Sequence, residues 1–274
     1  MKQKKKVATY AALFVLTSIS MLPILWMSSV SFRDNTEIFS IPVKWIPEQL
    51  NMESYRRVLA NPELIQFFVN SYIIAFCVTF LCVLLASLTG YGFSRFKFAG
   101  KKIALVYILL TQVFPMVLLS IPYFLFISRM GLYNTYTALI LAYTSFALPF
   151  SILMMRDFIN SIPRELDEAA TIDGYGPFRT FLYIILPPAL PGLIATAVYT
   201  FILAWNEFLF AVVLTQTVEK RPLTIGIGFL IGEFTTEWNQ LAALSFMSSI
   251  PLIVIFLFIQ KYLLQGLTAG SVKN

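Results

Sequence analysis

The reactive side chains that most enzymes depend on are scarce in this sequence. It contains no histidine, the commonest general base and a frequent metal ligand. Cys77 and Cys82 lie five residues apart in one apolar run, where small buried side chains are commoner than a disulfide or a metal site. The segment Gly226–Gly232 is rich in glycine but lacks the Gly-Lys-Ser/Thr ending of a phosphate-binding loop. We therefore expect no catalytic residue, metal or cofactor in this chain, and any ATP hydrolysis must come from another chain.

Charged side chains gather in one stretch between two long apolar segments, from Glu165 to Pro187. Pro163 suits the first turn of a helix, and Gly174 suits the left-handed residue just past its end. Between them the apolar residues fall roughly along one side and the acids on the other. The apolar positions are Leu166, Ala169, Ala170 and Ile172, and the acids are Glu165, Asp167, Glu168 and Asp173. Because alanine is small, another surface can approach closely, so the stretch indicates either a docking helix or an ordinary surface helix.

Three polar residues interrupt apolar runs, where such side chains are costly. Asn206 and Glu207 follow Trp205 in one run, and Gln112 lies in another. The Glu207 carboxylate is either paired to a neighbouring helix or lines a water-filled path, and the sequence favours neither. Hydrogen bonding between helices is the default for an amide such as Gln112. All three are candidates for a transport pathway or its gate.

The composition indicates a membrane protein. Of 274 residues, 58% are hydrophobic and 12% are charged, with a mean hydropathy of +0.77; globular proteins carry roughly twice that charged fraction. Six apolar runs are long enough to cross a hydrocarbon core, and lipid favours helices because their backbones satisfy their own hydrogen bonds. The runs cover residues 7–30, 68–93, 103–127, 136–155, 190–214 and 241–264. We predict an all-α membrane protein with one domain over residues 1–274. Four prolines within the runs predict either kinks in a transport path or static bends: Pro115, Pro122, Pro149 and Pro251.

Lysine and arginine in the short connections set the orientation of the spans. Four lysines precede the first run and four basic residues lie from Arg95 to Lys102, whereas the connection between the third and fourth runs offers only Arg129. Both termini and the loop 156–189 are therefore predicted on the cytoplasmic side of a multi-pass protein of the cell (cytoplasmic/inner) membrane. The net charge of +6 forms no basic patch, so nucleic acid is not expected as a partner.

The same polar stretch resembles the signature loop of the permease subunits of binding-protein-dependent ABC importers. That family's pattern is Glu-Ala-Ala, three residues, Gly, nine residues, Ile, one residue, Leu-Pro. The sequence matches every spacing through Glu168, Ala169, Ala170, Gly174, Ile184, Leu186 and Pro187. The resemblance covers nearly the whole chain, including GYGFSRFKFAGKK at the end of the second run and AWNEFLFAVVL in the fifth. The carboxy-terminal GLTAGSVKN is similar to the tail of the shorter permease subunit of maltose-type carbohydrate importers, although relatives often end in glycine where this chain has Asn274.

This resemblance implies the type I fold of ABC importer permeases, with six transmembrane helices and both termini in the cytoplasm. It implies a second, homologous permease subunit in the same lipid bilayer, two ATPase subunits that bind ATP and Mg, and an extracytoplasmic solute-binding protein. The coupling loop 156–189, with Glu165 beside the motif residues, would bind one ATPase subunit. The tail residues Thr268, Ala269, Gly270 and Lys273 would reach between the ATPase subunits, and the loop within 226–239 would approach the binding protein.

The expected function is ATP-dependent import of a sugar, with a maltose-like oligosaccharide as the first hypothesis. Glycerol 3-phosphate or another polyol is the alternative, because importers of glycerol phosphate share this type of permease. An ion-coupled secondary transporter would place paired acids or histidines near mid-membrane, and this chain offers mainly Glu207. A membrane-embedded enzyme would need converging reactive groups in the spans, and none is apparent. The expected mechanism is alternating access, in which ATP binding closes the ATPase dimer and the docked loop moves with it.

Overall fold

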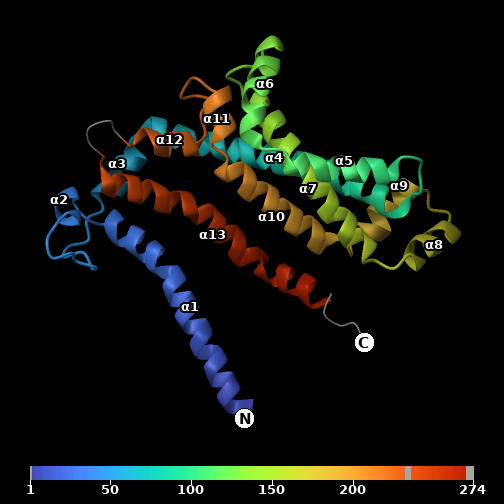
Figure 1. Ribbon diagram of the computed structural model, residues 1–274, viewed down its shortest axis with the longest axis horizontal. Coiled ribbons are helices and arrows are strands. Elements are labelled where there is room, and N and C mark those ends of the chain that lie inside the picture. The colour runs from blue at the N-terminus through green and yellow to red at the C-terminus, as the bar shows by residue number, and fades with distance from the viewer. Residues whose placement is uncertain (1, 232–235, 270–274) are drawn as a thin grey trace. The chain divides into compact units, whose positions relative to one another are not determined.

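The structure is a computed structural model that describes residues 2–231 and 236–269, with side chains for 6–231 and 236–260 (Figure 1). The named elements in these residues are helices. In chain order they are α1 (Lys2–Ser31), α2 (Asn35–Ile38), α3 (Glu53–Ala60), α4 (Pro62–Arg95), α5 (Lys101–Val113), α6 (Met116–Arg129), α7 (Tyr136–Asn160), α8 (Glu165–Ile172), α9 (Pro177–Thr180), the π-helical turn η1 (Phe181–Ile185), α10 (Leu190–Asn206), α11 (Leu209–Leu214), α12 (Leu223–Phe229) and α13 (Trp238–Ala269).

Within the described residues, four helices are long and apolar enough to cross a membrane unbroken. They are α1, α4, α7 and α13, and they coincide with the first, second, fourth and sixth predicted runs. Two bent pairs reach that length only when each pair is counted as one span. The prediction of an all-helical membrane protein is confirmed, with four to six spans; the exact count of six stays a prediction.

The third predicted span, 103–127, is not one continuous helix. The helices α5 and α6 meet at an angle of 101°. Pro115 has no N–H to donate and disfavours helical backbone in the residue before it, and Phe114 is extended, with φ −74° and ψ 128°. The other three prolines expected to interrupt spans lie inside continuous helices, Pro122 in α6, Pro149 in α7 and Pro251 in α13. Only Pro115 of these four therefore ends a helix.

The fifth predicted span, 190–214, is also interrupted. The helix α10 ends at Asn206 and the short α11 begins at Leu209. Before α10, the segment Pro177–Ile185 meets it at an angle of 88°. Pro187 and Pro188 lie at this corner and cannot donate backbone hydrogen bonds, so a helix cannot run through them undisturbed. The approach to this span is therefore a bent path rather than a straight helix.

Internal packing divides the described chain into two units. The first takes its residues from 1–65 and 226–250, and includes α1, α2, α3 and the start of α13. Its parts are joined by polar contacts, such as the amide of Asn35, which donates to the Glu237 carboxylate, and by edge-on packing of Trp26 and Trp45 with ring centres 5.2 Å apart. The apolar window of α1 is 0% buried, so that helix offers its surface to lipid or another chain. The single domain over 1–274 stays a prediction.

The second unit takes its residues from 66–225 and from 251 onward, and its core lies where α4, α7 and η1 meet. The buried core residues are Ala86, Tyr91, Phe93, Ile152, Met155, Ile159, Ile162, Phe181, Ile185 and Ala189. Two glycines bring backbones unusually close to α7. A Cβ at Gly90 of α4 would lie 2.8 Å from the Arg156 nitrogen, and one at Gly192 of α10 would lie 2.5 Å from Cγ of Phe158. The last turns of α7 are therefore held tightly by both α4 and α10.

Candidate functional site

The polar stretch forms the predicted helix, and its end is the one the sequence predicts. Its start differs: Pro163, expected in the first turn, lies before the cap residue Arg164. The helix α8 covers Glu165–Ile172, and Gly174 has a φ of +80°. Beyond it, the N–H of Tyr175 donates to the Ala170 carbonyl at 2.9 Å and that of Gly174 to the Thr171 carbonyl at 3.1 Å. This pair of bonds is the Schellman arrangement, which needs a left-handed residue after the helix. The acids of the first turn also complement the positive end of the helix dipole.

The two alanines of the motif lie on different sides of α8. Ala170 is buried, with 3% of its surface exposed, whereas Ala169 is exposed. The apolar Ile172 is 87% exposed. Glu165 and Glu168 are also exposed, although Glu168 borders the cavity between α8 and the end of α4. The expectation of one common small-residue face is therefore corrected: Ala170 packs within this chain, and Ala169 lies with the surface that the chain leaves uncovered.

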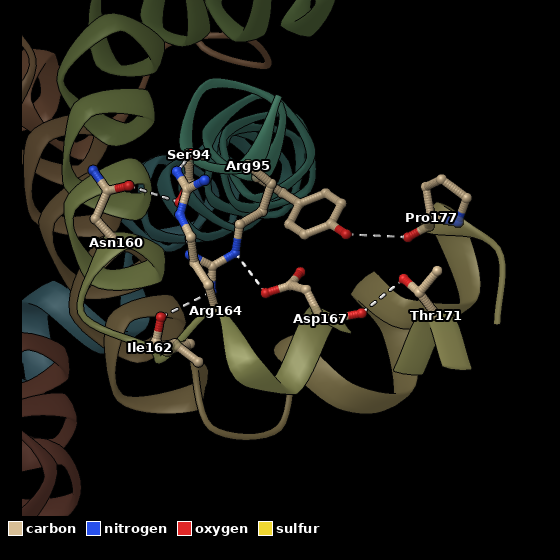
Figure 2. Close-up of polar contacts among 9 residues, drawn as sticks. Ser94, Arg95, Asn160, Ile162, Arg164, Asp167, Thr171 and Pro177 are labelled. Carbon is tan, nitrogen blue, oxygen red and sulfur yellow. Dashed lines mark hydrogen bonds and ion pairs between the residues drawn. The ribbon is translucent and has the colours of Figure 1, made fainter. Parts of the chain in front are cut away.

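An ion pair joins α8 to the end of α4 (Figure 2). Nε of Arg95, the last residue of α4, lies 2.9 Å from Oδ2 of Asp167, and the two side chains are 7% and 21% exposed. In the described part of the chain neither of these two atoms has a hydrogen-bond partner, so the contact is electrostatic. Nη2 of Arg95 donates to the Ile162 carbonyl at 2.9 Å, which also fixes the turn that leads into α8.

Other polar contacts surround this ion pair. Arg164 donates to the Ser94 carbonyl at 3.1 Å, and the Ser94 hydroxyl donates to the Asn160 side chain at 2.7 Å. The Tyr91 hydroxyl donates to the Pro177 carbonyl at 3.4 Å. A cavity of about 310 Å³ lies among these groups, lined in part by Tyr91, Arg95, Arg164 and Asp167. The helix α8 is thus attached to α4 through discrete polar contacts around a cavity.

The second half of the motif, Ile184, Leu186 and Pro187, connects the loop to the protein core and to α10. Ile184 and Leu186 are half-buried and pack against the core formed by α4, α7 and η1. Ile185, between them, is fully buried, and Pro187 is exposed at the corner that leads to α10. In the motif, Glu168 and Ala169 are therefore exposed on α8, whereas Ala170, Ile184 and Leu186 pack within the chain.

The carboxylate of Glu207 is used at the break between α10 and α11. Its Oε1 accepts the Phe210 N–H at 2.8 Å and its Oε2 the Ala211 N–H at 3.2 Å, so the side chain caps the first turn of α11. Asn206 donates to the Ile202 carbonyl of its own helix at 2.8 Å, and Gln112 is exposed in α5. A pathway role for these three residues stays a prediction.

Comparison with known proteins identifies the family. Residues 82–269 match the family of binding-protein-dependent transport system inner membrane components. The chain belongs to this family. The trehalose/maltose transport system permease protein MalG of Thermococcus litoralis is 35% identical to this permease over 273 residues, covering 98% of each chain. The sulfoquinovosyl glycerol transport system permease protein SmoH of Agrobacterium fabrum is 30% identical over 265 residues, covering 97% of this chain and 93% of SmoH.

A solved structure shows the same fold. It is a bacterial ABC transporter involved in the import of the acidic polysaccharide alginate, and one of its chains superposes with a TM-score of 0.83 at 22% identity. The match covers 95% of this permease and 96% of that chain. The family model and the relatives confirm the resemblance found in the sequence, and the fold is that of a type I ABC importer permease.

Sequence reasoning missed several residues that hold the permease loop. As a basic residue beside an apolar run, Arg95 indicates only topology, and the sequence pattern predicts no role for Ser94, Arg164 or Ile185. The available signal for Ser94 and Arg95 is the segment GYGFSRFKFAGKK, which resembles the family. The tail residues Thr268, Ala269, Gly270 and Lys273 lie outside the residues whose side chains the structure describes.

Proposed function

We propose that this permease forms, together with a second homologous permease subunit, the path by which a sugar delivered by an extracytoplasmic binding protein crosses the membrane. The family match supports binding-protein-dependent transport. The names of two relatives, a trehalose/maltose permease and a sulfoquinovosyl glycerol permease, support a carbohydrate. A maltose-like oligosaccharide is the first substrate to test. Glycerol 3-phosphate is the second, because the SmoH system carries a glycerol conjugate.

The observation that carries this proposal is the form of α8. It is a short helix with a fixed carboxy-terminal end, and its inner side is attached to its own chain through Ala170 and Asp167. Its outer side presents the apolar Ile172 beside Ala169 and the exposed acid Glu165, and the exposed Glu168 lies at the edge of the cavity. An apolar surface with a polar rim on an otherwise polar loop is a common form of protein interface. This outer side binds a cleft on one ATPase subunit.

The mechanism is alternating access driven by the partner ATPases. ATP and Mg bind to those subunits, and closure of the ATPase dimer displaces α8 because α8 is bound to one of them. The helices then rock so that the path opens to the side of the binding protein. In this arrangement both termini and α8 lie in the cytoplasm, six spans cross the membrane, and the carboxy-terminal tail reaches between the ATPase subunits.

Reconstitution of the complete transporter in lipid vesicles tests the proposal. The permease is combined with its partner permease, two ATPase subunits and the binding protein, and uptake of labelled maltose, trehalose and glycerol 3-phosphate is compared. Uptake should require both ATP and loaded binding protein. Uptake driven by a proton or sodium gradient without ATP would show instead that the chain belongs to a secondary transporter.

A substitution on the outer side of α8 tests the docking surface. Ile172→Asp places a charge at a side chain that is 87% exposed, so it should leave folding intact and greatly reduce copurification of the ATPase subunits. Ile46→Asp is the matched control, because Ile46 is 80% exposed in the segment before α3. Equal ATPase binding by the two variants would exclude Ile172 from the interface.

A further inference from the structure

Arg95 and Asp167 form a contact that differs from the other ion pairs of the described chain. Lys44–Glu48 and Arg57–Glu53 are i,i+4 pairs, and Arg156–Asp157 joins neighbours in the sequence. Those pairs are local, and each has at least one side chain that is about half exposed or more; such pairs contribute little to stability. Arg95–Asp167 connects two helices and is largely buried. It therefore constrains where α8 lies relative to α4, whereas the local pairs constrain no tertiary arrangement.

Burial makes this pair costly to break. Both charges lose solvation when they are buried, and removing one leaves the other uncompensated. A buried ion pair is weak evidence for overall stability, because well-packed apolar side chains of similar size can do as well or better. Its advantage here is geometric. The guanidinium contacts the Asp167 carboxylate and the Ile162 carbonyl at once, so it fixes both the first turn of α8 and the residues before it.

The end of α4 is in turn connected closely to α7. The Ser94 hydroxyl bonds to Asn160 at 2.7 Å, and the contact of Gly90 with α7 leaves no room for a Cβ. Helix α7 is packed in the same way against α10 at Gly192. Because well-packed interiors are stiff, a displacement of the end of α4 must be passed to α7 and α10. By contrast, α8 borders a cavity of about 310 Å³ on the side of α4. Polar contacts, from Asp167 and from Arg164 just before α8, join it directly to the end of α4, so they are the direct route by which its displacement can reach α4.

We propose that Arg95 and Asp167 are positioning residues that transmit the movement of α8 to the transmembrane helices, with the ion pair as the link between α8 and α4. This inference rests on the proposed function, since α8 moves only if an ATPase subunit binds it. Without the ion pair, α8 can follow the ATPase subunit while α4, α7 and α10 lag behind. The predicted defect is uncoupling, in which ATP is hydrolysed with less sugar transported.

Three variants of the reconstituted transporter test this link. Asp167→Asn and Arg95→Met each remove one charge with little change in size, and the third variant combines them. The measured quantity is sugar uptake per ATP hydrolysed, normalised to the amount of assembled complex. We expect each single variant to lower this ratio about fivefold or more, the range of typical coupling between distant sites. The double variant should be no worse than the worse single variant, because both substitutions break the same contact.

Two further variants separate transmission from folding. Arg95→Lys keeps the positive charge but loses the fork that reaches both acceptors, so it should recover part of the ratio lost in Arg95→Met. Asp157→Asn is the matched control, because in the described residues Asp157 forms an ion pair with its sequence neighbour Arg156 and its side chain is 63% exposed; it should transport normally.

The proposal is overturned by additive effects in the double variant, by normal uptake per ATP in the single variants, or by single variants that fail to assemble. Failed assembly would make the pair a folding contact only. The proposed function fails on a different result, absence of ATP-dependent uptake by the unmodified transporter.

Discussion

Replacing Gly174 by valine should impair transport while leaving the permease in the membrane. Gly174 has a φ of +80°, and a Cβ added there would have no atom within 4 Å. The cost of the substitution is therefore backbone strain rather than a clash, about 1–2 kcal/mol for a left-handed residue with a side chain. A penalty of that size changes an equilibrium constant roughly 5- to 30-fold. The strain weakens the two backbone hydrogen bonds that end α8, which the N–H groups of Tyr175 and Gly174 donate.

The consequence should be confined to α8. Because the added Cβ meets no atom within 4 Å, the substitution should not disturb the core formed by α4, α7 and η1, and membrane abundance and pairing with the second permease should be unchanged. Sugar uptake per permease should fall several-fold, with weaker copurification of the ATPase subunits, because the docking surface is no longer held in one orientation. Uptake in vesicles and quantitative immunoblotting of the membrane fraction measure the two effects separately.

Gly176→Val provides a closely matched control. Gly176 is two residues further on and likewise has no atom within 4 Å of an added Cβ, but its φ is −75° with ψ 163°, which valine adopts readily. The same side chain is thus added to the same loop without backbone strain. If both variants transport equally poorly, the effect comes from the bulk of valine, and the reasoning from the left-handed turn is refuted.

Three further predictions concern orientation, the break before α11 and the energy source. A cysteine at the exposed Asp173 should resist an impermeant thiol reagent in intact cells, whereas one at the exposed Gln49 should react; labelling at Asp173 would reverse the predicted orientation. Glu207→Ala removes the cap of α11 and should destabilise that helix by about 1 kcal/mol, seen as a lower unfolding temperature of the purified complex, whereas Glu207→Gln keeps an acceptor and should be milder. The purified chain without ATPase subunits should neither bind nor hydrolyse ATP, and hydrolysis by contaminant-free chain would contradict the permease assignment.

The helix α8 could be predicted from the sequence because its determinants are local. A proline before the first turn, acids within it and a glycine after it act within a dozen residues. The left-handed Gly174 follows from the same local chemistry. The long apolar runs were equally readable, since a hydrocarbon core demands a certain length whatever lies around it. Both kinds of signal are independent of tertiary contacts.

The positions at which the spans bend or break could not be predicted equally well from the sequence. Pro115 and Pro149 both lie in apolar runs, yet the helix ends at the first and continues through the second. A helix can continue past proline when neighbouring groups satisfy the freed backbone, and that depends on packing. The break at Glu207 is similar, because the carboxylate becomes a cap only when the chain leaves the helix after Asn206.

Arg95 is the clearest case of a residue whose tertiary partner cannot be predicted from the sequence pattern. As a basic residue beside an apolar run it contributes to the cytoplasmic charge that orients the protein, and that interpretation needs no partner. A charge that served orientation alone could remain in water, yet this side chain is 7% exposed and contacts an acid 72 positions away in the sequence. The acids of α8 divide accordingly: Asp167 faces its own chain, Glu168 is exposed at the edge of the same cavity, and Glu165 is exposed away from it. One short helix therefore presents one charged side to the transmembrane helices and another to a partner, the arrangement expected of a helix that transmits movement between them.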